Sequence, residues 1–311
     1  MSDYKFVYGP VPSRRLGLSL GISPIPQKTC NYSCVYCQLG RTDCLTNERK
    51  MFFDVDKIIA EFQETVSSGI DFDVVTIVGE GEPTLYLGLG ELISKLKLLT
   101  KKPIALITNG ALLFDLGVQL EIESADIILP SLDSYDEKSF KKINRPHGSI
   151  HFDKVYQGLK DFSQKFSGEI WIEIMFVLGL NDDDEALLRF SDLLKNVRYN
   201  RLYLNTPVRP PAEKEVKTIS SNMMRHAVEV LGGTSIELLV SSGFHSEIPD
   251  NFEAILSIIR RHPMNQFEIE SFLRTRGCNN IDFIFLKLGN SREVESIDYK
   301  GYITYRIGES K

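Results

Sequence analysis

The chain has 311 residues, of which 42% are hydrophobic and 25% are charged, the balance of a soluble globular protein with a substantial core. Its formal net charge of -6 provides no general attraction to nucleic acid or anionic membranes, and no apolar run approaches the length of a membrane span. The first residues lack the apolar segment of a secretory signal. We therefore expect a cytoplasmic protein whose cysteines stay reduced.

Three of the five cysteines lie close together near the N-terminus. They are Cys30, Cys34 and Cys37, in C-x3-C-x2-C spacing. In a reducing compartment such a group indicates a soft metal and not disulfides. Three thiolates alone cannot complete a tetrahedral zinc site or a four-cysteine cluster. We therefore expect a [4Fe–4S] cluster with one iron left open, which can bind a substrate.

Apolar β-runs alternate with helical patterns after the cysteines. A helix is expected at 53–69, capped by Asp54 or Asp56 and ended by Gly69. Strands are expected at 17–23, 74–79, 104–109, 127–133, 170–177 and 202–205, and further helices near 88–98, 113–121, 151–165 and 183–196. Six such β/α units predict an α/β fold, a partial (β/α)6 TIM-like barrel whose site lies at the C-terminal ends of the strands.

Polar residues fall at the ends of these strands. The alternation in 170–177 places Glu173 on the face that points into the barrel. Ser131 and Asp133 share one side of their strand end, and Asn109 and Asn205 each end a strand. A buried carboxylate without a partner is costly, so Glu173 implies a partner or a ligand. A hydrogen-bond network that only stabilises the barrel is the alternative.

The pattern changes after the last of these strands. A proline-rich segment at 208–213 is followed by a helix near 217–231 and a strand at 235–240. Two helices then follow, the second capped by Asn265 and Glu268, and a third lies near 279–288 before a hairpin hinged at 300–301. This order is typical of a winged helix-turn-helix. We expect a barrel domain at 1–212, a connecting segment at 213–248 and the winged-helix-like domain at 249–311.

Several of these motifs together resemble the radical S-adenosylmethionine (radical SAM) superfamily. They are the cysteine motif with Tyr36 before its third cysteine, the Gly-Glu-Gly-Glu-Pro-Thr-Leu run at 79–85, Asn109, and the strand end at 131–133. The segments 9–17 and 143–146 resemble uncharacterised iron–sulfur oxidoreductases grouped with wyosine-base-forming enzymes. Because the chain has no cysteine before Cys30, it lacks the ligands for a second cluster, and we do not expect wyosine formation.

The resemblance implies two cofactors, a [4Fe–4S] cluster on the three cysteines and S-adenosylmethionine on its open iron. One electron then breaks the sulfonium C–S bond, and a 5′-deoxyadenosyl radical abstracts hydrogen from the substrate. The electron comes from a donor such as flavodoxin or ferredoxin, and an oxygen-sensitive cluster favours an anaerobic host. The residues implied to contact S-adenosylmethionine are Tyr36, Gly79, Glu80, Gly81, Glu82, Asn109, Ser131, Asp133 and Glu173.

Each of these assignments has a structural alternative. The two glycines can simply form a tight strand-to-helix turn, and Ser131 and Asp133 can cap the next helix. Arg145 and Asn205 are candidate substrate contacts, although Arg145 can equally form a surface ion pair. Cys44 and Cys278 are expected to be ordinary small residues.

The substrate is not determined by these motifs. An RNA base or a peptide is slightly favoured, and no membrane partner is expected. The alternative is a DNA-binding regulator that senses redox state or S-adenosylmethionine through the C-terminal domain. Its third helix, at 279–288, carries few basic residues, so DNA binding is disfavoured.

Overall fold

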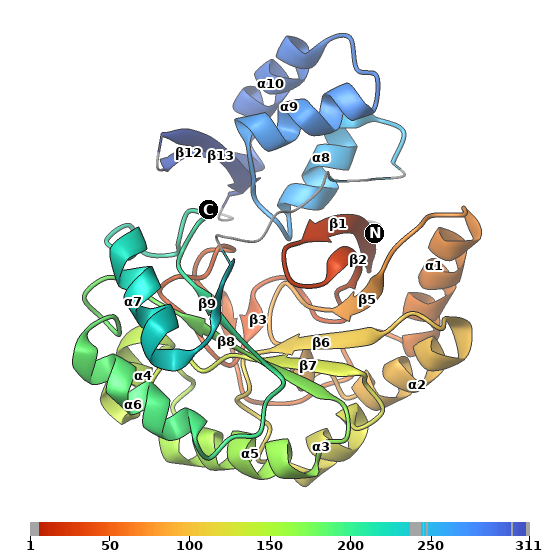
Figure 1. Ribbon diagram of the computed structural model, residues 1–311. Helices are drawn as coiled ribbons and strands as arrows, with labels where there is room; N and C mark the ends of the chain where they lie inside the picture. The colour runs from red at the N-terminus through yellow and green to blue at the C-terminus, as the bar shows by residue number, and fades with distance from the viewer. Residues whose placement is uncertain (1–5, 237–243, 245, 247, 300, 309–311) are drawn as a thin grey trace.

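The computed structural model describes residues 6–236, 244, 246, 248–299 and 301–308. Its larger part is a mixed α/β fold built on an eight-stranded sheet in the order β1-β2-β5-β6-β7-β8-β9-β10 (Figure 1). β1 and β2 are antiparallel, and the other neighbouring pairs are parallel. The strands are β1 (Val7–Ser13), β2 (Gly17–Ile22), β5 (Val74–Ile77), β6 (Ile104–Thr108), β7 (Ile127–Pro130), β8 (Glu169–Met175), β9 (Arg201–Asn205) and β10 (Thr234–Ser235).

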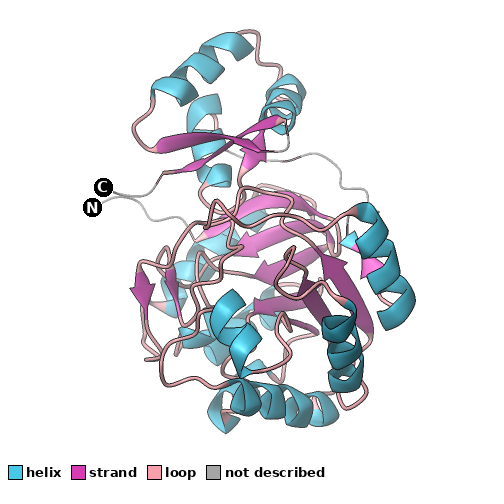
Figure 2. Cartoon of the chain, turned by 90° about the vertical axis from the view of Figure 1, so that its left-hand side faces the viewer, coloured by secondary structure: helices cyan, strands magenta, loops and turns pink. Residues whose placement is uncertain are grey.

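Helices cover the outer face of this sheet (Figures 1 and 2). They are α1 (Val55–Ser67), the 3-10 helix η1 (Pro83–Leu85), α2 (Leu89–Leu99), α3 (Leu116–Ile122), α4 (Glu137–Ile143), α5 (Phe152–Lys165), α6 (Asp184–Leu194) and α7 (Ser221–Leu231). Asp54 caps α1 through its side chain, as expected. The short strands β3 (Thr29–Cys30) and β4 (Cys44–Leu45) pair within the cysteine region. The predicted alternation of strands and helices is confirmed, with boundaries shifted by a few residues.

Besides the short β3, β4 and η1, two longer elements of this domain were not predicted. β1 contains a glycine and two prolines, residues that disfavour a strand, and it is tolerated because it lies at the edge of the sheet. α4 is a seven-residue helix that begins with a capping box between Asp136 and Ser139. Its short apolar stripe is too brief to be recognised by periodicity.

The two faces of the sheet pack differently. Ile170, Ile172 and Ile174 of β8 join the large core under the helices, whereas Trp171 joins a second apolar cluster on the inner face. This is the predicted alternation along the strand. In the part of the chain that the structure describes, β1 and β10 are the two edges of the sheet. The barrel is therefore partial and leaves an opening along its side.

A smaller module follows the barrel and has its own core. It consists of α8 (Asn251–Ile259), α9 (Gln266–Thr275) and α10 (Ile281–Asn290), with a sheet of β11 (Met264–Asn265), β13 (Tyr302–Ile307) and β12 (Val294–Tyr299). Asn265 and Glu268 form the expected capping box of α9. The three helices and the hairpin occur in the expected order, and their classification as a winged helix stays a prediction. Positions 237–240 of the expected strand at 235–240, and Lys300 of the hairpin hinge, lie outside the described residues.

The module sits over the barrel beside β1 and β2 (Figures 1 and 2). The hydroxyl of Tyr299 donates to the carbonyl of Pro207 at 2.7 Å, and Gln38 Nε2 donates to the carbonyl of Arg261 at 3.3 Å. These contacts join the module to the segment after β9 and to the cysteine loop. In the described residues, each helix is too short or too polar to cross a bilayer.

Candidate functional site

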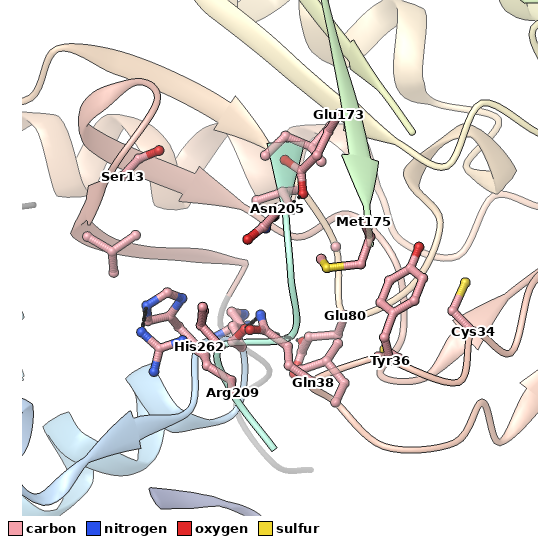
Figure 3. Close-up of a pocket in the computed structure, with 18 of the residues that line it drawn as sticks. Ser13, Cys34, Tyr36, Gln38, Glu80, Glu173, Met175, Asn205, Arg209 and His262 are labelled. Atoms are coloured by element: carbon pink, nitrogen blue, oxygen red, sulfur yellow. Dashed lines mark hydrogen bonds and ion pairs between the residues drawn. The ribbon is translucent and has the colours of Figure 1, made fainter. Parts of the chain in front are cut away.

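A cavity of about 440 Å³ lies between the inner face of the sheet and the C-terminal module. Its wall combines the turn between β1 and β2, the cysteine loop, the turn at 79–81 (the glycine turn), and the ends of β8 and β9. Figure 3 shows Cys34 and Tyr36 on one side of this space and Arg209 and His262 on the other. The module contributes three polar side chains to the wall, Arg261, His262 and Glu268.

All three cysteines of the C-x3-C-x2-C motif line the cavity and are partly exposed. The N–H of Cys37 donates to the carbonyl of Cys34 at 3.1 Å, which closes a turn between the second and third thiols. Burial raises the pKa of Cys30, Cys34 and Cys37 above the ordinary value, and neighbouring carboxylates and sulfurs add to this effect at Cys30 and Cys34. A raised pKa keeps the thiols protonated, so they release their protons when they bind a metal.

The number of thiols bears on the kind of metal site. A structural zinc site needs a fourth protein ligand. In a [4Fe–4S] cluster each thiolate binds a different iron, so three thiolates leave one iron open. The three thiols on the cavity wall therefore match the ligand set of a cluster with one open iron.

Amide groups approach two of the sulfurs. Asn109 Nδ2 lies 3.6 Å from Cys30 Sγ, and Asn144 Nδ2 lies 3.6 Å from Cys34 Sγ. The backbone N–H of Tyr32 also points at Cys30 Sγ, at 3.4 Å. Such donors stabilise thiolate charge and tune a metal bound to it. Asn144 was not predicted as a site residue, although it stands beside Arg145 in a motif that the sequence analysis singled out.

The glycine turn follows β5 and contacts the cysteine loop through its backbone. A Cβ on Gly81 would stand 1.7 Å from the carbonyl oxygen of Thr29, and one on Gly79 would stand 2.3 Å from a neighbouring isoleucine. The N–H of Glu82 donates to the same Thr29 carbonyl at 3.0 Å. The close approach requires glycine and brings backbone groups to the edge of the cavity.

Glu82 is almost fully occupied by groups of the protein itself. Its carboxylate accepts from the N–H of Thr84 at 3.0 Å, from the hydroxyls of Thr84 and Thr108 at 2.6 Å each, and from the N–H of Asn109 at 2.8 Å. Burial raises the pKa of Glu82, and these hydrogen bonds oppose the rise. Glu82 thus caps η1 and fixes the glycine turn to the end of β6.

Asp133 positions Tyr36 beside the cysteines. It accepts a hydrogen bond from the Tyr36 hydroxyl, another from Asn144 Nδ2 at 3.1 Å, and a third from a backbone N–H of β8 at 2.9 Å. Burial raises the pKa of Asp133, and these donors oppose the rise. The side chain that caps α4 is Asp136, so neither Ser131 nor Asp133 serves as that cap.

Three of the residues predicted to contact S-adenosylmethionine lie together in a smaller hollow. Asn109, Ser131 and Asp133 line it, and Tyr32 borders both this hollow and the main cavity. The ends of β6 and β7 place these side chains there, as expected for neighbouring parallel strands.

Glu173 has partners inside the barrel. It forms an ion pair with Arg15 from the β1–β2 turn and accepts from Asn205 Nδ2 at 3.2 Å. Burial lowers the pKa of Arg15 to about 10. The partner inferred from the cost of a buried carboxylate is therefore a protein side chain, and both Glu173 and Asn205 face the cavity (Figure 3).

Arg145 lies apart from the residues that line the cavity. It binds the carboxylate of Glu213, which also accepts from Arg41 Nε and Nη2 at 2.9 and 2.8 Å. Glu213 is buried, and the hydrogen bond from Arg41 is the main cause that lowers its pKa. Arg145 thus joins two loops in an ion-pair network, the structural alternative considered for it, and substrate contact by Arg145 stays a prediction.

Two arginines at the module interface were not predicted as site residues. Arg209, after β9, donates to Glu268 at 3.1 and 3.2 Å, and its Nη2 lies 2.6 Å from His262 Nε2. Arg261 pairs with Glu80 of the glycine turn at 3.5 Å. The proline-rich run at 208–213 marks the segment that contains Arg209 as irregular. Nothing in the sequence indicates which residues of the module contact Arg209.

An open parallel barrel with a three-cysteine loop and an adjoining glycine turn defines the architecture of radical SAM enzymes. The model of the Radical SAM superfamily matches residues 25–191, and the chain belongs to this superfamily. It is accordingly a radical SAM enzyme, and the cofactors of its family are a [4Fe–4S] cluster and S-adenosylmethionine.

The relatives of the chain include UPF0026 proteins. The chain is 36% identical over 307 residues to the UPF0026 protein MJ1312 from Methanocaldococcus jannaschii. The aligned region covers 96% of this chain and 94% of that protein. The chain is 37% identical over 218 residues to another from Synechocystis, covering 70% of this chain and 81% of that protein. A solved radical SAM methyltransferase from Sphaerobacter thermophilus matches with a TM-score of 0.51 at 15% identity, over 71% of this chain and 68% of that one. This last likeness supports the fold alone.

Proposed function

We propose that this protein uses a [4Fe–4S] cluster, bound by Cys30, Cys34 and Cys37, to cleave S-adenosylmethionine reductively and abstract a hydrogen atom from its substrate. The observation that carries the proposal is the shared cavity: the three thiols and the backbone of the glycine turn line the same wall. The donor set fits because the thiols face the cavity without disulfide bonds and amide donors approach two of them. The glycine turn fits because its residues line the cavity while its backbone packs directly against the cysteine loop.

The bound cluster supplies the electron that breaks the sulfonium C–S bond, and the adenosyl fragment then takes hydrogen from the substrate. The chain itself binds, orients and shields these groups. Gly79 and Gly81 present backbone to the methionine end, with Glu80 beside them. Tyr36, held by Asp133, faces the adenine end.

The hydrogen bonds refine two of the predicted roles. Because Glu82 and Asp133 already accept three or more hydrogen bonds each, we assign them to positioning the glycine turn and Tyr36. Asn109 is similarly engaged, since it donates to Asn31 at 2.7 Å and accepts from Ala111 at 2.9 Å. Ser131 then remains the candidate for a direct hydrogen bond to the ribose.

The broader assignment includes partners and domains. A one-electron donor such as flavodoxin or ferredoxin is required, and a cytoplasmic location fits the reduced cysteines. We retain 1–212 as the barrel domain, 213–248 as the connecting segment and 249–311 as a winged-helix-like domain. An RNA base or a peptide remains the preferred substrate class, with Asn205 as a substrate contact. A DNA-binding regulator has no support among the relatives.

The test is anaerobic reconstitution with iron and sulfide, followed by dithionite and S-adenosylmethionine, with 5′-deoxyadenosine and bound iron as readouts. Cys34→Ala should lose the cluster absorbance and reduce 5′-deoxyadenosine to the level without enzyme. The matched control is Cys44→Ala, an exposed cysteine beyond the motif, which should retain both. Full iron content and cleavage in Cys34→Ala would refute the assignment, as would a preparation that binds zinc in place of a cluster.

A further inference from the structure

The wall of the cavity carries excess positive charge, although the whole protein carries a net charge of -6. Six cationic side chains line it, against three carboxylates. A small cavity with walls of one charge sign concentrates ligands of the opposite sign. The cationic residues are Arg14, Arg15, Lys28, Arg41, Arg209 and Arg261, and the acidic residues are Glu80, Glu173 and Glu268.

Most of these charges are already compensated inside the protein. Each of the three glutamates has an arginine partner, and Arg41 binds a glutamate outside the cavity; the pairs are Glu173–Arg15, Glu80–Arg261, Glu268–Arg209 and Glu213–Arg41. Within the described residues, Arg14 and Lys28 form no ion pair. Lys28 is buried two residues before Cys30, so it belongs to the cysteine end of the cavity, where bound thiolates would compensate its charge. Arg14 is left as an uncompensated cation.

Arg14 stands at the turn between β1 and β2. The Ser13 hydroxyl shapes this turn by accepting from the N–H groups of Arg15 at 3.4 Å and Leu16 at 3.2 Å. Figure 3 shows Ser13 on the same side of the cavity as His262, away from Cys34. Arg14 follows Ser13 in this turn and lines the cavity, so the turn that carries it lies on the side away from Cys34.

Arg209 and His262 form the facing part of this side of the cavity. Both line the same cavity as Arg14, and they contact each other, with Arg209 Nη2 2.6 Å from His262 Nε2. Burial is the main cause that lowers the pKa of each, and the positive charge of Arg14 adds to the effect on both. Since Arg209 Nη2 can only donate, His262 Nε2 accepts from it, which leaves Nδ1–H of the neutral ring as a donor. The charge of Arg14 is therefore left for an anion to neutralise, and Arg209 and the neutral His262 supply further hydrogen-bond donors beside it.

We propose that the end of the cavity formed by Arg14, Arg209 and His262 binds an oxyanion of the substrate, a phosphate or carboxylate group. The guanidinium groups match either oxyanion in geometry and charge. The cavity of about 440 Å³ would also hold the cofactors of the proposed function, so it leaves room for a small group of the substrate and not for a folded macromolecule. Because this end lies opposite the cysteines, the anchored anion directs the other end of the substrate toward them. The inference rests on the proposed function for the identity of the reacting group.

The test is isothermal titration calorimetry of the full chain with inorganic phosphate, and in parallel with acetate, at constant ionic strength. Arg14→Gln should weaken binding of the preferred ion by at least about tenfold, because a charge-assisted contact is lost. Arg14 is exposed and has no ion pair among the described residues, so this variant should fold normally. Glu268→Gln should instead strengthen binding, because it removes the carboxylate that competes for Arg209 while glutamine can still complete the capping box.

Arg274→Gln is the matched control, an exposed arginine of the same module that pairs with Glu270 on α9, and it should bind as the wild type does. Stronger binding of phosphate indicates a phosphorylated substrate, and stronger binding of acetate indicates a carboxylate. The proposal fails if the wild type binds neither ion, or if Arg14→Gln and Arg274→Gln behave alike. The titration needs neither S-adenosylmethionine nor turnover, so its failure leaves the radical SAM assignment intact, and a chain without cleavage activity can still pass it.

Discussion

Gly81 packs its backbone so closely against the Thr29 carbonyl that no side chain fits between them. We expect Gly81→Ala to push the glycine turn off the cysteine loop and to lower the free energy of unfolding by about 1–3 kcal/mol. Binding of S-adenosylmethionine, measured by equilibrium dialysis on the reconstituted protein, should be lost at the same time. Gly148→Ala is the control, because a Cβ at Gly148 meets nothing within 4 Å. Equal binding by the two variants would contradict the assigned role of the glycine turn.

His262 should make stability depend on pH. Its folded pKa lies well below the ordinary value because of burial first and then the charges of Arg209 and Arg14. The unfolded chain therefore takes up this proton first, so stability is full above about pH 6.5 and declines below it, by at most about 1.4 kcal/mol per pH unit. Urea unfolding at several pH values gives the free energy of unfolding as a function of pH. Below about pH 6.5 this free energy should fall less steeply for His262→Gln than for the wild type. An equal fall in the two proteins would exclude His262 as the cause of the loss of stability in acid.

At the scale of elements, α8 is followed by a residue that reaches the barrel, Arg261, two positions after the helix ends at Ile259. The Arg261 side chain is 6% exposed and that of Glu80 in the glycine turn is 3% exposed, so their ion pair is buried. Arg261→Met should cost about 3 kcal/mol of stability, because it leaves a carboxylate buried without this partner. Adding Glu80→Gln should recover much of the loss.

The measurement is a double-mutant cycle by guanidinium unfolding. Arg274→Met provides the comparison, since its exposed ion pair with Glu270 should be worth less than about 1 kcal/mol. If the effects of Arg261→Met and Glu80→Gln simply add, the two side chains are not coupled and the link between module and glycine turn is wrong.

On the scale of the whole molecule, the apolar contacts form separate cores in the barrel and in the module. The contacts that join the two parts include polar ones, such as those made by Gln38, Arg209 and Tyr299. We expect differential scanning calorimetry to resolve two transitions, because each core can melt without exposing the other. A single transition with equal calorimetric and van't Hoff enthalpies would show that the two parts unfold as one unit.

The sequence by itself determined the alternation of strands and helices, the inward face of β8, the caps at Asp54 and Asn265, and the cysteine and glycine motifs. These features depend on periodicity, on local hydrogen bonds or on spacing along the chain, so neighbouring residues are sufficient to predict them. The strand β1 escaped prediction because its prolines are tolerated by its position at the edge of the sheet, which is a property of the sheet and not of the segment.

Tertiary structure decided which polar residues meet. Glu173 needed a partner, but its pairing with Arg15 depends on how β1 folds back along the barrel. Cofactor contact by Asp133 stays a prediction, but its hydrogen bond to Tyr36 is visible only in the folded chain. The cationic end of the cavity joins Arg14 to His262, which are separated by most of the chain. Charge and hydrogen-bond partners act through space over a few ångströms, and only the folded chain establishes those distances.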